Sequence, residues 1–570
     1  MFLGVKTVKT VISLYLLTFV LLGTGKIYAA DTDSPSQTGF LVVAADRGFV
    51  GNEEIRDAFA SFAADHPAAL VLVTDDRTRQ TLKLALDHLY SQKINRIVVL
   101  PLFISTAEPH YQLVRTLITE ENKIVPTVFA HPYGSSYFAV EALASQLRTM
   151  AAADHQHLLV VGYGAQEDKD RRAMYDDWKR IAKQAAQDIH FRSVNVLILP
   201  ERKEDETPEN YADKVKRQLS NTLASLKSVG KGVSSQVIPF ALGPKHDHMM
   251  SLESRLQWFL PKNTALGRSG IEPQQLTMWM QREANRNLPL VAENIGVILF
   301  AHGADFHWNE NLRTAVQPLT DRYKIEYAFS MADPFTIERA LRKLEQRGAQ
   351  TAIVVSAYAT SHSFRQEISY LTGLDIENQQ DSHDSNKGSG HGHHGQPDTP
   401  PARILTSLPV FWTGGYEDNP LFARALFDRV LALSRDPAKE TVILTAHGAR
   451  DDQQNEKWLR ELESIARYMS NNGGQKFKAF KTGTWREDWP EKREPWVKKI
   501  RAMVTEADKQ EGTAIVIPAR TTGTGPEKRF LNGLRFELGE GFAPHPLFTQ
   551  WVEEQIQQGI AQQKQQMIAN

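Results

Sequence analysis

Short apolar runs recur along the chain, and each has the length of a buried parallel strand rather than that of a helix. They occupy residues 41–45, 158–162, 297–301 and 442–446. A turn of small residues follows each run, then an amphipathic helical pattern and a second apolar run. Strand, helix and strand in this order form the βαβ unit of a parallel sheet. The pattern therefore predicts an α/β protein built from four copies of one unit.

The later part of the unit repeats as well. The second apolar runs occupy residues 97–103, 236–240, 353–355 and 514–518. Apolar stripes on the helices before them consist of Leu82, Leu86 and Leu89 in the first unit and of Ile337, Leu341 and Leu344 in the third. Each unit then reaches a proline where a last helix should begin, since proline costs least in a first turn. These prolines are Pro132, Pro273, Pro420 and Pro546.

Several polar residues stand where helices should begin, and we expect them to be caps. Asn52, Asn309 and Asn455 follow the first strand of three units. His131 and His545 directly precede two of the closing prolines, and we expect capping rather than ligand binding from them too.

The repeats divide the chain into four predicted domains behind an N-terminal leader. The predicted boundaries are 1–30 for the leader and 39–150, 155–290, 293–435 and 439–570 for the four units. Residues 378–401, inside the third unit, are polar and rich in Ser, Gly, His and Pro. Such a composition cannot bury a core, so we expect this insert to be disordered.

The composition limits which partners and which kinds of metal site are possible. A chain of 570 residues is too long for a single core, and its formal net charge of -1 lacks the basic excess of a protein that binds nucleic acid. We therefore expect no nucleic-acid partner. The absence of cysteine excludes disulfides, thiolate metal sites and iron–sulfur clusters, which leaves histidine and carboxylate as the strong metal ligands.

The N-terminus is typical of an export signal. Lys6 and Lys9 precede an apolar run over residues 11–25, and residues 27–30 offer a cleavage site. The run is short for a membrane span, which needs about 20 residues. We expect the leader to be removed, which leaves no stable span and a periplasmic protein; the alternative is an uncleaved anchor.

Histidines follow two predicted strands of the third unit, His302 after residues 297–301 and His362 after residues 353–355 and a short polar segment. The carboxyl ends of parallel strands meet at one rim of a sheet, where ligands bind. Paired imidazoles there suit Co²⁺, Ni²⁺, Fe²⁺ or Zn²⁺, and so few ligands leave coordination positions open. An imidazole can also take a proton when the metal leaves, as insertion into a macrocycle requires. The alternative is a pair of buried, hydrogen-bonded side chains.

The third unit carries the further motifs Ala301-His302-Gly303, Asn309-Glu310, residues 328–334 and Ser361-His362-Ser363. Taken together, these motifs resemble the class II chelatases of the sirohydrochlorin cobaltochelatase (CbiX-like) family. The resemblance is clearest over residues 293–548, moderate in the first unit and weak in the second. It implies flavodoxin-like, chelatase-like parallel-sheet lobes that face one another in pairs, a metal bound on one lobe and a tetrapyrrole between the two. The simplest arrangement is a tandem duplication, with units one and two and units three and four as two bilobal halves.

The resemblance also implies roles for single residues. His302 matches the family's first histidine and His362 its second, as metal ligands and proton acceptors. The family often places a glutamate before Asp333-Pro334, and none stands here. Asp333 is therefore a weak candidate ligand, or else a helix cap.

The other units depart from the motif. The fourth keeps His447, a weak candidate ligand, but has Arg520 where the second histidine should fall. The second unit has Tyr163 and the first has Asp46 in place of the first histidine. Only the third unit has both histidines, so we expect the working site in the C-terminal half.

Two other segments are candidates for ligand contacts. The insert contains His391, His393 and His394, which can bind a divalent metal weakly unless the segment is only a solvated linker. The second segment, a loop-to-helix stretch near prolines, carries Trp485, Trp489 and Trp496 with Arg486, Lys492 and Arg493. It either lines a pocket for an anionic, planar ring or packs against its own domain.

Three functions fit these observations. The first is an exported chelatase that inserts a divalent metal, Co²⁺ before the others, into a sirohydrochlorin-type tetrapyrrole. The second is a periplasmic carrier of metal or tetrapyrrole built on the same lobes, and the third is a scaffold whose sites are vestigial. A measurement of catalytic turnover with the metal and sirohydrochlorin distinguishes the chelatase from the carrier and the scaffold.

Overall fold

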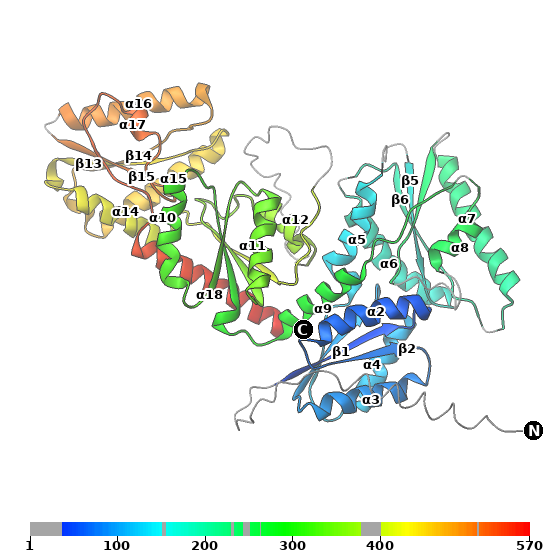
Figure 1. Cartoon of the computed structure of the whole chain (residues 1–570). Coiled ribbons are helices and arrows are strands. Elements are labelled where there is room, and N and C mark those ends of the chain that lie inside the picture. The colour runs from blue at the N-terminus through cyan, green and yellow to red at the C-terminus, as the bar shows by residue number, and fades with distance from the viewer. Residues whose placement is uncertain are drawn as a thin grey trace, which may run out of the picture.

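The computed structural model of the chain describes residues 37–150, 156–187, 189–203, 205–229, 233–242, 251–262, 264–377, 401–509 and 512–569 (Figure 1). The expected leader and the three histidines of the insert, His391, His393 and His394, lie outside these residues. Within them, no helix is both long enough and apolar enough to cross a membrane.

Four parallel sheets of four strands each make up the molecule, and all four share one topology. Their strand orders are β2-β1-β3-β4, β6-β5-β7-β8, β10-β9-β11-β12 and β14-β13-β15-β16. In each sheet the first strand of the unit lies between the second and the third, so that crossover helices cover both faces. The α/β prediction with four repeated parallel-sheet lobes is confirmed.

The first half consists of two lobes. The elements of lobe 1 are β1 (Thr38–Ala45), α2 (Gly48–Ala63), β2 (Ala68–Val73), α3 (Thr78–Ser91), β3 (Arg96–Leu102), α4 (Pro109–Glu121), β4 (Thr127–Phe129), η1 (Tyr133–Ser135) and α5 (Tyr137–Arg148). The elements of lobe 2 are β5 (Gln156–Tyr163), α6 (Asp168–Ala185), β6 (Ser193–Leu199), α7 (Pro208–Val229), β7 (Ser234–Pro239), α8 (Leu252–Phe259), β8 (Ala265–Leu266) and α9 (Pro273–Asn287).

The second half has the same plan. The elements of lobe 3 are η3 (Ala292–Asn294), β9 (Ile295–Ala301), α10 (Phe306–Val316), η4 (Gln317–Leu319), β10 (Lys324–Phe329), α11 (Pro334–Gln346), β11 (Thr351–Ser356), α12 (Arg365–Thr372), α13 (Leu374–Glu377), β12 (Val410–Gly414) and α14 (Pro420–Leu433). The elements of lobe 4 are η6 (Pro437–Lys439), β13 (Glu440–Ala446), α15 (Asp452–Asn471), η7 (Gly474–Lys476), β14 (Ala479–Thr484), α16 (Pro490–Lys509), β15 (Thr513–Pro518), α17 (Glu527–Phe530), β16 (Glu537–Leu538) and α18 (Pro546–Ala569).

Hydrophobic patterning accounts for most of these elements. Strands β1, β9 and β13 are buried along their whole length, as expected of central strands covered on both faces. The predicted stripes of α3 and α11 are buried as well: Leu82, Leu86, Leu89, Ile337, Leu341 and Leu344 are each at most 2% exposed. Proline begins three of the closing helices as predicted, whereas α5 begins five residues after Pro132, at Tyr137.

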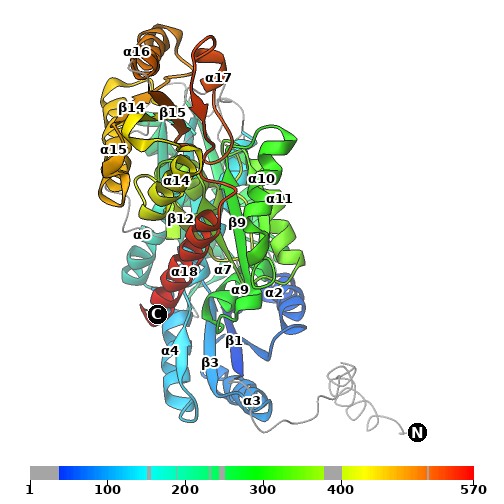
Figure 2. The same cartoon turned by 90° about the vertical axis from the view of Figure 1, so that its left-hand side faces the viewer.

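The closing helix of each lobe packs on the other lobe of its half, an exchange that the sequence did not indicate. Helix α5 contacts α6 of lobe 2, and α9 contacts α2 and β3 of lobe 1. In the same way α14 contacts α15 of lobe 4, and α18 contacts β11 and β12 of lobe 3. The red helix α18 accordingly lies along the green third lobe in both views (Figures 1 and 2).

The exchange joins the lobes in pairs. One hydrophobic core contains residues of both lobe 1 and lobe 2, such as Phe40 and Val160. Another contains residues of both lobe 3 and lobe 4, such as Leu299 and Leu444. The prediction of two bilobal halves is therefore confirmed.

The two halves meet at the segment before β12. Tyr137 Oη donates to the carbonyl oxygen of Ile404 (3.0 Å), and the amide of Thr406 donates to Tyr137 Oη (3.1 Å). Arg282, fully buried, lies over the Tyr137 ring and donates to the carbonyl oxygen of Thr406 (3.3 Å). Because buried polar groups are costly when unpaired, these bonds fix how the halves dock.

Candidate functional site

The two candidate histidines lie at one rim of the third sheet. Strands β9 and β11 are hydrogen-bonded parallel neighbours, with Phe300 opposite Ser356 near their carboxyl ends. His302 follows β9 directly, and His362 lies in the loop between β11 and α12. Both side chains are exposed, so neither ring is the buried core histidine of the alternative interpretation. Metal binding by the pair stays a prediction.

A hydrogen bond selects the tautomer of the neutral His302 ring. Its Nδ1 lies 2.7 Å from the carbonyl oxygen of Gly303. A carbonyl oxygen only accepts, so Nδ1 carries the proton and the neutral ring has its lone pair on Nε2. Gly303 has a φ of +77°, and a Cβ there would lie 2.8 Å from Cβ of Phe329. This glycine therefore both permits the turn and places the carbonyl that orients the ring.

The asparagine after the first strand holds the turn and does not cap the helix, so that prediction was wrong. In lobe 3 the cap is Asp305, whose side chain accepts from the amide of Trp308. Asn309 lies inside α10, and its Oδ1 accepts from the amide of Ala304 (3.1 Å). The matching bonds are Asn52 with the amide of Arg47 (2.7 Å) and Asn455 with the amide of Ala449 (3.2 Å).

Other loops of this rim have unusual backbone conformations. Ala332 and Phe364 have a φ of +60° and Glu417 a φ of +36°, in the left-handed region that favours glycine. They lie in the loops after β10, β11 and β12, respectively. Such outliers collect where surrounding structure holds a loop in a functional shape.

Asp333 stands at the N-cap position of α11, but its side chain makes no capping hydrogen bond. Its carboxylate is exposed on the same rim as His302. Among the described residues, no group of three or more His, Asp or Glu side chains is placed to hold a metal ion. The candidate site is therefore a pair of imidazoles, an arrangement that leaves coordination positions for water and a substrate.

His447 has the same backbone position in lobe 4 but a different environment. Its Nδ1 lies 2.9 Å from the carbonyl oxygen of Gly448, as in His302. Its Nε2, however, lies 3.1 Å from a carboxylate oxygen of Asp488. The nitrogen that would bind a metal therefore faces a carboxylate, and the ring is less available than that of His302.

The aromatic and basic segment of lobe 4 packs mainly against its own lobe. Trp485 is fully buried, and its Nε1 donates to Glu527 (2.9 Å). Arg486 is 4% exposed and donates to the carbonyl oxygen of Ala449 (2.7 Å). Trp489, by contrast, is half-buried and stacks edge-on beside His447, with ring centroids 5.9 Å apart. Packing therefore explains the side chains of Trp485 and Arg486, whereas the Trp489 ring lies beside His447.

Charged residues stand at the first histidine position of lobe 1 and at the second histidine position of lobe 4. In lobe 1 buried Arg47 pairs with Glu108 (3.2 Å), and Asp46 accepts from Nδ2 of Asn52 (2.7 Å). In lobe 4 Arg520 pairs with Glu487. Both charged residues are bound within their own lobe, Asp46 by Asn52 and Arg520 by Glu487.

The rims of lobes 3 and 4 touch. Oγ1 of Thr521 donates to the carbonyl oxygen of Ala357 at the end of β11 (2.9 Å), and Tyr416 Oη lies 3.1 Å from the same hydroxyl. Nδ2 of Asn311 lies 3.4 Å from Thr522 Oγ1. The carboxyl ends of β11 and β15 therefore face one another, and the loop that carries His362 begins at this junction.

Three exposed apolar side chains on the rim of lobe 3 were missed in the sequence. Phe306 is 70% exposed, Met331 57% and Phe335 71%. Phe306 and Phe335 occupy the first turns of amphipathic helices. Their positions outside the buried stripes are the signal that could have identified them.

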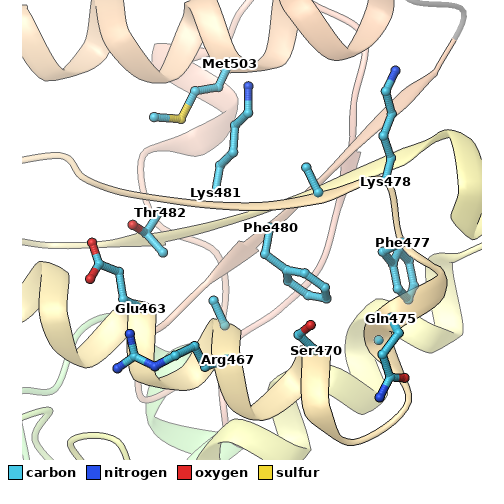
Figure 3. Close-up of a pocket in the computed structure, with 13 residues that line it drawn as sticks. Glu463, Arg467, Ser470, Gln475, Phe477, Lys478, Phe480, Lys481, Thr482 and Met503 are labelled. Carbon is cyan, nitrogen blue, oxygen red and sulfur yellow. The ribbon is translucent and has the colours of Figure 1, made fainter.

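Two hollows of about 610 Å³ each are lined by neither His302 nor His362. One runs along edge strand β14 between α15 and α16 and is lined by Arg467, Phe480, Lys481 and Met503, among others (Figure 3). The other lies between α10 and α18 and is lined by Arg322, His545 and Glu553, among others. His545 Nδ1 accepts from the amide of Leu547 (3.2 Å), so this predicted cap is confirmed. The prediction for His131 was wrong, because Ser136 stands at the N-cap of α5.

Glu461, on α15 at the junction of lobes 3 and 4, should make stability depend on pH. Burial, helped by the carboxylates of Glu417 and Asp418 and opposed by Lys457, raises its pKa to about 7. The native state therefore binds more protons than the unfolded chain between about pH 4.5 and pH 7. Stability should fall as pH rises through this window and level off above it. Thermal unfolding at pH 5 and pH 8 measures the change.

A matched pair of variants isolates this residue. Glu461→Gln should flatten the dependence of melting temperature on pH, because the amide does not titrate. Glu463→Gln, two residues away and exposed, should leave it as in the wild type. An equal pH dependence in Glu461→Gln and wild type would contradict the assignment.

Comparisons with known proteins find only distant structural likeness. No family model matches the chain, and no curated protein sequence matches it. The sirohydrochlorin chelatase SirB of Bacillus subtilis subspecies spizizenii, solved with cobalt, is 15% identical, with a TM-score of 0.28 over 41% of this chain and 87% of its own. A Deinococcus radiodurans multi-domain protein with structural similarity to chelatases is 14% identical, with a TM-score of 0.26 over 42% and 52%.

A sugar transport substrate-binding protein of Bordetella parapertussis matches to a similar extent. It is 14% identical, with a TM-score of 0.22 over 45% of this chain and 82% of its own. Likeness at this level does not separate a chelatase from a binding protein. The fold assignment rests on the four parallel sheets themselves, with their common strand order.

Proposed function

We propose that the C-terminal half binds a divalent cation between His302 and His362 and inserts it into a sirohydrochlorin-type tetrapyrrole. The metal is a substrate here, Co²⁺ before Ni²⁺, Fe²⁺ or Zn²⁺. A site of two imidazoles holds such a cation and leaves it free to gain the ring nitrogens as ligands.

The observation that carries the proposal is the state of the His302 ring. Its Nδ1–H is held by the Gly303 carbonyl, so the Nε2 lone pair is free at an exposed position on the rim that His362 shares. His447, which has the same backbone position, presents its Nε2 to Asp488 instead. Lobe 3 is therefore the better metal site.

The imidazole nitrogens that hold the metal can also accept the protons that metal insertion releases. Insertion of a divalent cation displaces two pyrrole protons, while the imidazoles lose their bonds to the metal. Each imidazole can then take one proton on the nitrogen that held the cation, and pass it to water. The two histidines thus serve first as ligands and then as bases.

The exposed apolar side chains on the rim are evidence for a large planar substrate. Phe306, Met331 and Phe335 expose apolar surface beside the loop of His302, where a macrocycle can cover it. Trp489 lies on the opposite rim, beside His447. Flat apolar surface on both rims fits a ring held between the lobes.

A carrier of metal or tetrapyrrole is the second candidate. Two features favour it: the charged residues Asp46 and Arg520, which stand at histidine positions on two rims, and the N-terminal leader, which we propose directs the chain to the periplasm. A carrier needs only to bind and release its cargo, so a single imidazole pair is enough.

One assay distinguishes a chelatase from a carrier. Sirohydrochlorin is mixed with Co²⁺ and the purified protein, and its absorbance is followed. A chelatase metallates the ring faster than the uncatalysed reaction over many turnovers, and His302→Ala and His362→Ala abolish the gain. A carrier binds one equivalent of metal or tetrapyrrole and does not accelerate metallation. His307→Ala removes an exposed histidine from the same region and serves as the matched control.

The assay is best done with residues 378–401 replaced by a short flexible linker, so that the histidines of the insert bind no metal. Arg403 pairs with Asp375 (2.7 Å) and holds the two ends of the segment together. The shortened chain should keep the rate of metallation. Loss of turnover from this change alone would contradict the placement of the site at His302 and His362.

A further inference from the structure

The loop that carries His362 is held by the loop after β12. Three backbone hydrogen bonds join them in succession: the amides of Gly415, Tyr416 and Glu417 donate to the carbonyl oxygens of Ser356 (2.8 Å), Tyr358 (3.1 Å) and Ala359 (2.7 Å). The contact is close, because a Cβ on Gly415 would lie 2.3 Å from the amide nitrogen of Ser361. The two loops thus form one layer at the rim.

The side chain of Glu417 extends this layer to the residue before the histidine. Its Oε1 accepts from the amide of Ser361 (3.1 Å) and from the Ser361 hydroxyl (2.8 Å). Both bonds are charge-assisted and therefore stronger than bonds between neutral groups. They fix the backbone at the residue next to His362.

The backbone of Glu417 is in a conformation that glycine adopts more readily. Its φ of +36° is left-handed, yet a residue with a carboxylate side chain, not a glycine, occupies this position. Strain of this kind persists where surrounding contacts hold it in place. The pair of bonds to Ser361 is such a contact.

The loop has a second anchor on its other side. Tyr358 Oη donates to the carbonyl oxygen of Ser330, in the loop after β10 (2.7 Å). His362 directly follows the anchored Ser361, and its side chain is exposed. Only Glu417 of the two anchors binds the residue adjacent to the histidine.

We propose that Glu417 is a positioning residue, which holds the imidazole of His362 where it can share a cation with His302. The inference rests on the proposed function. Glu417 does not itself bind the metal; it limits the orientations that the loop can adopt. Fixing a ligand in advance reduces the entropy lost on binding, so the cation is bound more tightly than by a free loop.

Two measurements on the chain with residues 378–401 replaced test the proposal. Hydrogen exchange of the peptide that covers residues 357–364 reports the order of the loop without metal. Co²⁺ titration, followed by the visible absorption of the bound ion, reports affinity. The variants are Glu417→Ala, Glu417→Gly and Glu417→Gln, with Asp418→Ala as the exposed neighbouring control.

Glu417→Ala and Glu417→Gly should exchange faster at Ser361 and bind Co²⁺ about 10- to 100-fold more weakly, the loss typical when a partner that orients a metal ligand is removed. Glu417→Gly also relieves the left-handed backbone, so it should lose affinity without a fall in melting temperature. Glu417→Gln keeps an oxygen acceptor for both donors and should restore both readouts. Asp418→Ala should match wild type.

The results that overturn the proposal are distinct. If hydrogen exchange of the loop peptide is the same in Glu417→Ala as in wild type, the carboxylate does not order the loop. Faster exchange with unchanged Co²⁺ affinity shows that the order has no role in metal binding. Failure of the proposed function is seen separately: if His302→Ala and His362→Ala leave Co²⁺ affinity unchanged, the metal site is elsewhere, and the role of Glu417 falls with it.

Discussion

Replacement of either His302 or His362 by alanine should lower Co²⁺ affinity by more than about 100-fold in the chain with residues 378–401 replaced. Removing only a hydrogen-bond partner of a metal ligand typically costs about 10- to 100-fold, so removing one of two ligands should cost more. Isothermal titration with Co²⁺ measures the loss. The double variant should be no weaker than the weaker single one, because one imidazole alone does not form the site.

Two other histidines provide controls. His307→Ala should bind Co²⁺ as wild type does, because His307 lies on the first turn of α10 and not in the strand-end loop. His447→Ala should also have little effect, since its Nε2 faces Asp488. Equal losses from all four single variants would instead indicate unspecific binding by exposed histidines.

Replacement of Trp551 by alanine should destabilise lobe 3 by about 3–5 kcal/mol, the usual cost of removing a large aromatic side chain from a core. Trp551 belongs to α18, at the end of lobe 4, and is fully buried. Its ring centroid lies 6.1 Å from that of Tyr416 in lobe 3 and 5.7 Å from that of Phe548. The loss should therefore appear in the lobe that receives the helix.

Urea unfolding with hydrogen exchange as the probe locates the effect. In Trp551→Ala the amides of β11 and β12 should exchange at lower urea concentration than in wild type. Trp258→Ala removes a tryptophan that is 66% exposed and should change stability little. A loss confined to the strands of lobe 4 would contradict the exchanged packing of α18.

The sequence predicted the strands and the buried helix stripes because hydrophobic period follows directly from local geometry. Leu82, Leu86 and Leu89 repeat at helical spacing and are buried. The exchange of closing helices was not predictable in this way. Pro546 marks where α18 starts, but the residues that follow would suit an apolar groove on either lobe, so the sequence does not specify its partner.

The candidate site was predictable in part. His302 and His362 could be placed on one rim, because each follows a strand of the same parallel sheet. The role of Asn309 was mistaken, since a polar residue near a helix start satisfies the capping rule equally well. Glu417 could not have been found at all, because it meets Ser361 only through a contact 56 residues away.

Diffraction from a cobalt-soaked crystal of the chain with residues 378–401 replaced, measured at the cobalt absorption edge, tests the central claim most directly. The account predicts one strong anomalous peak, about 2 Å from Nε2 of His302 and equally close to a ring nitrogen of His362. A peak on only one of the two rings, or at His447 in place of them, would contradict it.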